Sequence, residues 1–382
     1  MIPELSDVLA VICIAVAIYH YFGYPLIVVL ISRVWKQKPH DAEREPSITL
    51  VIAAYNEESV IRAKIENSLA LDYPRAKYEI VIVADGSTDA TPGIAAEYSS
   101  DAVRCMYEPA RRGKSHALNR AVASSRAEIL VFTDANNELS NDSLRYLVNA
   151  LSQERVGGVS GAKRIIENQE RAASVGDGLY WRYESMIKLA ESRLGGTVAA
   201  DGEIFAVWRD LYKPIPPEVI NDDAFLTLAV VQQGYKVAYE PAATATEEAS
   251  ITIADDFRVK VRMIAGGYQF IAMYWRSVAG TGWFAFKYFS HKILRWLMPL
   301  CLITLLLISL LRANEWPYTV LCIAQLLFYG VAAAGALAPA LRNASKFVYV
   351  PFYFTTMNLA AFLGLIKFLS GNQSVLWAKA ER

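Results

Sequence analysis

Several features common in other protein classes are scarce in this chain of 382 residues. The four cysteines are scattered, and three of them, Cys13, Cys301 and Cys322, lie in apolar segments, so the sequence offers neither a disulfide framework nor a zinc-binding spacing. Lysine and arginine together number 38, as do aspartate and glutamate, and this balance gives no indication of a nucleic-acid partner. No GxGxxG is present, so the dinucleotide-binding fingerprint is absent.

Apolar residues make up 54% of the chain and are concentrated at its two ends. Residues 5–31 are almost uncharged and exceed the roughly 20 residues that a helix needs to cross a bilayer, which predicts an uncleaved membrane anchor. Arg33, Lys36 and Lys38 follow directly. Because basic residues favour the cytoplasmic side, the next part of the chain is predicted to be cytoplasmic.

Three further apolar stretches, at about 294–311, 317–341 and 347–369, predict three more spans. The link at 342–346 is basic and is expected to be cytoplasmic, which leaves the link at 312–316 outside. These features predict a multi-pass protein of the cell (inner or plasma) membrane with a cytoplasmic middle domain. The spans contain few ionisable residues of the kind that mark a transport path, so a transporter is disfavoured.

Residues 257–293 mix basic and aromatic side chains. Such a mixture is typical of helices that lie in the headgroup plane of a bilayer, and an ordinary amphipathic helix that covers the sheet is the alternative. The predicted organisation is an anchor at 1–35, a cytoplasmic α/β domain at 36–256, interfacial helices at 257–293, three spans at 294–370 and a tail at 371–382.

The middle domain alternates between apolar runs typical of strands and segments with helical spacing. The predicted strands are 47–54, 78–84, 103–107 and 128–133, and the predicted helices between them are 58–71, a segment ending at Tyr98, and 113–124. This alternation predicts an α/β fold with a mixed, mostly parallel sheet flanked by helices.

Polar residues follow two of the predicted strands, at the edge where ligands bind in open α/β sheets. Asp134, Ala135 and Asn136 end one strand, and a carboxylate with an amide oxygen two residues later suits a divalent cation. Asp85 and Gly86 end another, where Asp85 can accept a hydrogen bond from a base or a ribose. Turn and cap residues are the alternative for both segments.

Four motifs in order carry a resemblance to a known family. They are Ala54-Tyr55-Asn56-Glu57-Glu58, Asp85-Gly86-Ser87-Thr88-Asp89-Ala90-Thr91, Arg112-Gly113-Lys114-x-x-Ala117-Leu118-Asn119 and Thr133-Asp134-Ala135-Asn136. Over about residues 47–267 the chain resembles the GT-A-fold family 2 glycosyltransferases. Its membrane arrangement resembles the branch of hyaluronan, chitin-oligosaccharide and cellulose synthases.

The resemblance implies an inverting sugar transfer from a nucleotide-sugar donor, with a lean toward UDP, and a divalent metal, Mg²⁺ or Mn²⁺, on the diphosphate. Asp85 matches the residue that contacts the base, and Lys114 matches a lysine near the donor. Asp134 and Asn136 match the two ligand positions of the DxD motif, here with an amide in the third position. The implied donor site comprises Ala54, Tyr55, Glu57, Asp85, Gly86, Lys114, Asp134, Ala135, Asn136, Arg258 and Arg262.

The resemblance also implies an acceptor side, for a glycan or a lipid-linked acceptor. Its residues are Tyr180 and Trp181 on an aromatic helix, Asp201, Gly202 and Glu203 in a small-residue loop, and the acidic pair Asp222 and Asp223. Asp223 matches the catalytic base, which an acceptor hydroxyl requires because its pKa lies far above 7. A helix cap is the alternative for the acidic pair.

One motif of the processive synthases, QxxRW, is altered. Val259 and Met263 stand where glutamine and tryptophan would be, and Arg262 is retained. Arg258 and Arg262, four residues apart on one helix face, can reach a diphosphate. The missing tryptophan favours one or a few sugar additions over long-chain polymerisation. A processive synthase that translocates its product, or a non-catalytic nucleotide-sugar sensor, remains the alternative; Asn136 favours the sensor and Asp223 opposes it.

Overall fold

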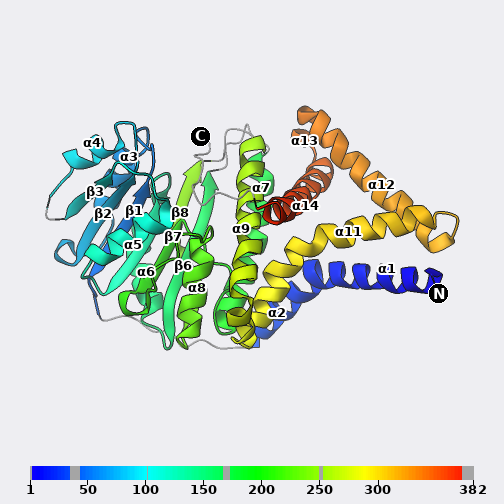
Figure 1. The fold of residues 1–382 in the computed structure, drawn as a ribbon, viewed down its shortest axis with the longest axis horizontal. Helices are drawn as coiled ribbons and strands as arrows, with labels where there is room; N and C mark the ends of the chain where they lie inside the picture. The colour runs from blue at the N-terminus through cyan, green and yellow to red at the C-terminus, as the bar shows by residue number, and fades with distance from the viewer. Residues whose placement is uncertain (1, 35–43, 101, 167–172, 249–252, 372–382) are drawn as a thin grey trace.

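The computed structural model describes residues 2–34, 44–100, 102–166, 173–248 and 253–371, and for residues 2, 3 and 173–180 it describes the backbone only. Figure 1 shows an α/β domain on one side and long helices on the other, with α7 and α9 standing between them. All of the predicted tail at 371–382 except Gly371, and most of the link after the anchor, lie outside the described residues.

One eight-stranded sheet forms the core of the domain, in the order β3-β2-β1-β4-β7-β6-β8-β5. The strands are β1 (Ile48–Ala54), β2 (Tyr78–Asp85), β3 (Val103–Glu108), β4 (Ile129–Asp134), β5 (Glu138–Leu139), β6 (Val156–Ile166), β7 (Ile204–Trp208) and β8 (Lys236–Glu248). The strands β3, β2, β1 and β4 are neighbours in that order and run parallel, and β6 is parallel to β8. The strand β7 is antiparallel to β4 and β6, and β5 is antiparallel to β8. The predicted mixed, mostly parallel sheet is therefore confirmed.

Helices cover both faces of the sheet (Figure 1). They are α3 (Ile61–Leu69), α4 (Thr91–Glu97), α5 (Lys114–Ser124), α6 (Ser143–Leu151), α7 (Ala173–Arg193) and α8 (Asp222–Gln232). The helix α9 (Ile253–Ala279) lies further from the sheet, against α8 and α14. Alternate residues of one strand point to opposite faces. On β1, Leu50 packs in one core with α3, α4 and α6, and Val51 packs in the other with α5 and α8. Burial on both faces explains why these strands read as continuous apolar runs.

The register of the parallel strands places the predicted polar turns side by side. Ala53 of β1 is paired with Asp134 of β4, and Ala54 is paired with Ala84, which directly precedes Asp85. The carboxyl ends of β1, β2 and β4 therefore meet at one edge of the sheet. Three of the residues predicted to bind the donor, Ala54, Asp85 and Asp134, lie at this edge.

Four helical segments are long and apolar enough to cross a membrane. They cover Glu4–Val34, Trp283–Leu311, Trp316–Leu337 and Lys346–Leu369. The first consists of α1 (Ile2–Ile18), a π-helical turn and α2 (Tyr24–Val34), and the second of α10 (Trp283–Tyr288), a π-helical turn and α11 (Leu294–Leu311). The other two are α12 (Trp316–Leu337) and α14 (Lys346–Leu369), with the short helix α13 (Pro339–Ala344) between them.

The helices in the segment predicted as interfacial, residues 257–293, have other bounds than expected. Its main helix, α9, begins at Ile253, and the apolar segment that contains α11 already begins at Trp283. In Figure 1, α9 runs across the direction of α1, and it packs against α14. Trp275 and Trp283 at this turn are half exposed, as residues at a membrane interface often are.

Buried ion pairs fasten the domain to the long helices. The Glu184 carboxylate of α7 is 2% exposed and lies 2.8 Å from the Arg295 guanidinium and 3.2 Å from the His291 imidazole. Two turns further along α7, Glu191 accepts a hydrogen bond from the Tyr24 hydroxyl at 2.5 Å. Burial opposes the charge of Glu184, but the cations around it outweigh that effect and hold its pKa well below the ordinary value. α7 is thus joined to both apolar segments that contain π-helical turns.

Candidate active site

Two loops that follow β1 and β2 are tied to each other at the edge of the sheet. The Asn56 side chain accepts a hydrogen bond from the Thr88 backbone N–H at 2.8 Å, and the Asn56 N–H donates to Ser87 at 3.1 Å. Beside them the Arg111 guanidinium lies 3.5 Å from the centroid of the Tyr55 ring. A fixed aromatic ring capped by a cation at this edge can hold one face of a base.

Asp85 is fully buried and organises the chain that leads to Lys114. Its carboxylate accepts backbone N–H groups from Arg112 at 3.0 Å and from Gly113 at 2.7 Å. Gly86, with φ of +67°, lies so close to Arg111 that a Cβ there would approach within 2.5 Å, a geometry that only glycine tolerates. Asp85 therefore holds the segment that leads to Lys114, and its contact with a base remains a prediction.

Lys114, the first residue of α5, reaches across the edge to two carboxylates. Its amine lies 2.8 Å from Asp134 and 3.5 Å from Asp222. Burial would lower the pKa of this amine, but the two carboxylates outweigh burial and raise it. A permanently charged lysine thus joins the end of β4 to the start of α8.

The Asp134-Ala135-Asn136 turn presents oxygen ligands at the mouth of the site. Asp134 and Asn136 are partly exposed, and the Asn136 amide bonds to no other side chain among the residues that the structure describes. Those residues contain no group of three or more His, Cys, Asp or Glu side chains that would cage a metal. One carboxylate, an amide, water and phosphate oxygens are a donor set that suits Mg²⁺ or Mn²⁺, so the turn fits a metal shared with a bound diphosphate.

Asp222 and Asp223 form the first turn of α8, and Asn221 precedes them at the cap position. Burial, followed by the neighbouring Asp222 carboxylate, raises the pKa of Asp223 to about 7. A carboxyl with that pKa can take up a proton near neutral pH. A Cβ placed on Gly202 would lie 3.7 Å from the Lys114 amine and 3.9 Å from Cβ of Asp223, so the loop predicted for the acceptor faces both.

The acceptor loop has two buried lysine partners that were not predicted. Lys188 of α7 donates to Asp201 at 2.5 Å, and Lys163 of β6 donates to Glu203 at 2.6 Å. The second Asp201 oxygen is buried and has no hydrogen-bond partner within the described part of the chain. Burial would raise the pKa of Glu203, but Lys163 outweighs it and lowers the pKa to about 2. Glu203 thus remains charged, and Asp201 offers one unused acceptor oxygen.

Trp181 of α7 lies among three lysines from three elements. The amines of Lys163, Lys188 and Lys260 are between 5.5 and 5.6 Å from the centroid of its ring. Tyr180 also lies in α7, but its side chain is outside the described residues. The structure therefore brings Trp181, Asp201 and Glu203 to one region next to the acidic pair.

The two arginines of α9 have different surroundings. Arg262 is affected by the charges of Asp222, Asp134 and Asp223, and burial lowers its pKa in spite of them. Arg258 is 76% exposed and pairs with Asp255 on its own helix. Arg262 thus belongs to the carboxylate cluster in this structure, whereas Arg258 points to its own helix.

Residues that the sequence did not single out also shape the site. Lys64, Lys163 and Lys188 are almost fully buried, and Arg111 covers Tyr55. For Lys64 a signal exists in the sequence, because it lies between Ile61 and Ile65 on the apolar face of its helix. The partners of the other three are far away in sequence.

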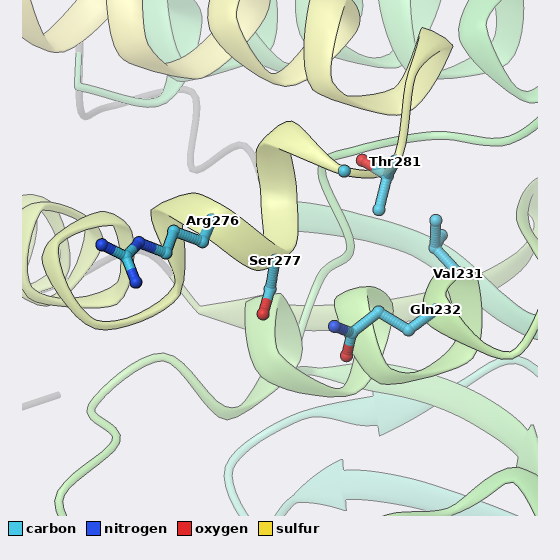
Figure 2. A pocket seen from close by; sticks show the side chains of 6 residues that line it. Val231, Gln232, Arg276, Ser277 and Thr281 are labelled. Atoms are coloured by element: carbon cyan, nitrogen blue, oxygen red, sulfur yellow. The ribbon is translucent and has the colours of Figure 1, made fainter.

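A separate hollow of about 390 Å³ lies where α9 ends before α10 (Figure 2). It is lined by Val231, Gln232, Arg276, Ser277, Gly280 and Thr281. None of the predicted site residues lines it, and it contains no carboxylate.

The fold is of the GT-A type, and comparisons with known proteins point to the glycosyltransferases. Residues 49–214 match the family model described as Glycosyl transferase family 2. This part of the chain, less than half of its length, is therefore similar to the family 2 glycosyltransferases.

Among individual proteins, the chain is 29% identical over 237 residues to a beta-monoglucosyldiacylglycerol synthase of Nostoc, covering 60% of this chain and 51% of the synthase. It is 24% identical, with 60% and 57% covered, to a poly-beta-1,6-N-acetyl-D-glucosamine synthase of Staphylococcus epidermidis. The chain thus spans little more than half the length of these two relatives.

A solved structure is similar over nearly the whole chain. It is the mannosyltransferase PcManGT from Pyrobaculum calidifontis in complex with GDP-Man and Mn²⁺. The sequence identity is 27%, 96% of this chain and 100% of that chain are covered, and the TM-score is 0.71. The likeness therefore includes the long helices as well as the sheet domain.

Proposed function

We propose that the protein transfers a sugar, with inversion, from a nucleotide-sugar donor to a glycan or lipid-linked acceptor in the synthesis of a cell-surface polysaccharide or glycolipid. The observation that carries the proposal is that the Lys114 amine lies within 3.5 Å of both the Asp134 and the Asp222 carboxylates. Asp223, the next residue, has a pKa that is raised to about 7. This cluster combines a site for a diphosphate with a base for a hydroxyl.

On the donor side, Tyr55 and Asp85 would border the base, and Lys114 would turn from Asp134 to the diphosphate. Asp134 and Asn136 would hold Mg²⁺ or Mn²⁺, which supplies positive charge to the departing diphosphate when bound. Arg262 and Lys114 add fixed positive charge on the same side, and charge placed in advance lowers the barrier. The complex of PcManGT with GDP-Man and Mn²⁺ supports such a donor and metal.

On the acceptor side, Asp223 would take the proton of the acceptor hydroxyl as its oxygen bonds to the anomeric carbon. The bond from that carbon to the diphosphate oxygen breaks at the same time, and the nucleoside diphosphate leaves with the bonding electrons. Attack opposite to the leaving group inverts the anomeric carbon. Trp181 would contact the acceptor through its ring, and the unused oxygen of Asp201 would accept one of its hydroxyl hydrogens.

The acceptor class is proposed as lipid-linked or short. Two observations favour it over long-chain polymerisation: Met263, which occupies the tryptophan position of the processive motif, is 43% exposed, and the relatives include synthases of a glycolipid. A processive synthase is the second candidate, and it is favoured by the poly-N-acetylglucosamine synthase among the relatives. Product length measured by gel electrophoresis distinguishes the two.

The test of the proposed function is nucleotide release by the full chain in detergent or nanodiscs. A panel of UDP-sugars and GDP-sugars is offered with Mn²⁺, with diacylglycerol and short oligosaccharides as acceptors. We expect turnover with one donor and none for Asp134→Ala. Absence of turnover with every pair, together with nucleotide binding that does not change in Asp134→Ala, would contradict the proposal.

We further propose that the domain is cytoplasmic and that the four apolar segments span the cell membrane, with both chain ends outside. The basic residues after the first segment and in the link at 342–346 support this orientation. Reporter fusions test it: a periplasmic or extracellular reporter at the C-terminus is expected to be active, and the same reporter inserted at the exposed loop residue Asp210 is expected to be inactive.

A further inference from the structure

Lys64 of α3 is a buried lysine close to the Asp134–Asn136 turn. It is 2% exposed and lies between Ile61 and Ile65, which are fully buried. A lysine at such a position is rare, because taking an amine out of water is costly unless hydrogen bonds compensate. Burial lowers the pKa of Lys64 to about 7, and the nearby carboxylates of Asp134 and Glu138 act against that shift.

The Lys64 amine uses all three of its hydrogen-bonding positions. It donates to the Thr133 hydroxyl at 3.0 Å, to the Asn137 carbonyl at 2.9 Å and to the Asn137 side-chain oxygen at 2.7 Å. The Thr133 hydroxyl also donates to the same Asn137 side chain at 2.9 Å. None of the three acceptors is a carboxylate, so the amine bonds to the backbone and side chains of one turn and forms no ion pair within the described part of the chain.

These partners lie on either side of the proposed metal ligands. Thr133 directly precedes Asp134, and Asn137 directly follows Asn136, so one amine holds both ends of the turn. The Asn137 amide also donates to the Glu203 carbonyl at 3.3 Å. The chain of contacts therefore runs from α3 through the donor turn to the acceptor loop, where Gly202 faces Lys114 and Asp223.

We propose that Lys64 is a positioning residue of the transferase, which holds Asp134 and Asn136 in the geometry that a metal–diphosphate requires and in register with the acceptor loop. The inference rests on the proposed function. Metal ligands on a turn bind well only when neighbouring groups restrict that turn, because otherwise binding must first order it. Lys64 supplies that restriction from a rigid helix, and it touches neither donor nor acceptor.

The test compares Lys64→Met with Arg62→Met, two positions away on the same helix. Arg62 is half exposed and pairs with Glu97, so its replacement alters the helix surface and leaves the turn intact. Mn²⁺ binding to the full chain in detergent is measured by electron paramagnetic resonance, with UDP and, separately, with GDP. We expect Lys64→Met to weaken Mn²⁺ binding at least fivefold and Arg62→Met to leave it unchanged.

A double-mutant comparison separates positioning from general support of the fold. If Lys64 acts through Asn137, then Asn137→Leu weakens Mn²⁺ binding, and the double variant is no weaker than the more severe single variant. If the fold-changes in Mn²⁺ affinity caused by Lys64→Met and Asn137→Leu multiply in the double variant, the inference is contradicted.

Other outcomes are equally decisive. A lower melting temperature in Lys64→Met with unchanged Mn²⁺ affinity would assign the residue to stability alone. A higher affinity would mean that removal of a positive charge outweighs the loss of the contacts. If Lys64→Met does not fold, Asn137→Leu, which removes the side-chain acceptor of the Lys64 amine, is measured instead, and unchanged Mn²⁺ affinity there overturns the inference. Wild-type protein that binds no Mn²⁺ with either nucleotide contradicts the proposed function itself.

Discussion

The Lys114 amine lies 2.8 Å from the Asp134 carboxylate, although the two residues come from different elements of the sheet domain. In the absence of a donor this ion pair neutralises two charges at the mouth of the site. In the proposed function, a bound diphosphate would offer the amine a stronger set of acceptors, and Asp134 would be available to hold a divalent metal. The pair would thus provide both charges that the donor requires.

Replacement of Asp134 is expected to weaken the metal-dependent binding of the donor. Asp134→Asn removes the charged ligand and the partner of Lys114, so we expect Mn²⁺-dependent nucleotide binding to weaken by a factor of about ten to one hundred. Isothermal titration with UDP and GDP, with and without Mn²⁺, measures this. The control is Asp210→Asn, because the Asp210 side chain is 92% exposed. Equal Mn²⁺ dependence in both variants would contradict the metal role.

Asp223→Asn is expected to stop the chemical step while the donor still binds. The loss of a general base costs about 10²- to 10⁴-fold in kcat, and the amide keeps the shape of the side chain. Nucleotide release under saturating donor measures kcat, and the donor Kd is measured separately. If kcat stays within threefold of wild type, the base lies elsewhere, and Asp201 is the next candidate.

The activity is expected to rise with pH and to level off above about 7. Burial and Asp222 raise the pKa of Asp223 to about 7, and only the deprotonated carboxylate can accept the hydroxyl proton. The profile of kcat between pH 5 and 9 measures this effect, with Asp210→Asn as the control. A rate that does not change between pH 5.5 and 8 would contradict the assignment.

The same pKa shift has a consequence for stability with the opposite pH dependence. An unfolded aspartate has a pKa of about 3.9, so the folded protein retains the Asp223 proton over a range in which the unfolded chain has lost it. The free energy of unfolding therefore falls as the pH rises from about 4 to 7. Asp223→Asn lacks this penalty, and its melting temperature is expected to exceed that of wild type at pH 8 and to match it near pH 4.

The buried Glu184 is expected to stabilise the packing of the sheet domain against the long helices. Glu184→Gln leaves the cations of Lys292 and Arg295 without their shared carboxylate, and breaking such a buried pair costs about 3–5 kcal/mol. Thermal unfolding in detergent measures the loss. The matched control is Glu97→Gln, whose partner Arg62 is exposed, and its effect is expected to be negligible.

Trp181 is expected to affect the acceptor and not the donor. Trp181→Ala removes a ring next to Asp201, and aromatic contacts are worth about 0.5–1.5 kcal/mol, so the acceptor KM is expected to rise up to about tenfold. Trp181→Phe, which keeps a ring, is the graded control. A change confined to the donor KM would place this ring on the other side of the site.

The first four strands of the sheet and the long apolar helices could be predicted from the sequence alone. Runs such as Ile129–Phe132 are apolar on both faces because helices cover both faces of the sheet. The polar turns at Asp85 and Asp134 follow from the same pattern, because parallel strands end at one edge. Local periodicity was sufficient for these features, since each depends on residues that are neighbours in the chain.

The partners of the polar residues depend on the tertiary structure. The Asp85 carboxylate accepts backbone N–H groups from the turn before Lys114. Arg258 pairs with Asp255 on its own helix, whereas Arg262 lies near the carboxylates of the site. The partners of Lys64 and Lys188 are side chains from distant or separately folded segments. A buried charge must find its compensation in space, and the distance between two residues in space is set by the packing of the whole sheet and its helices.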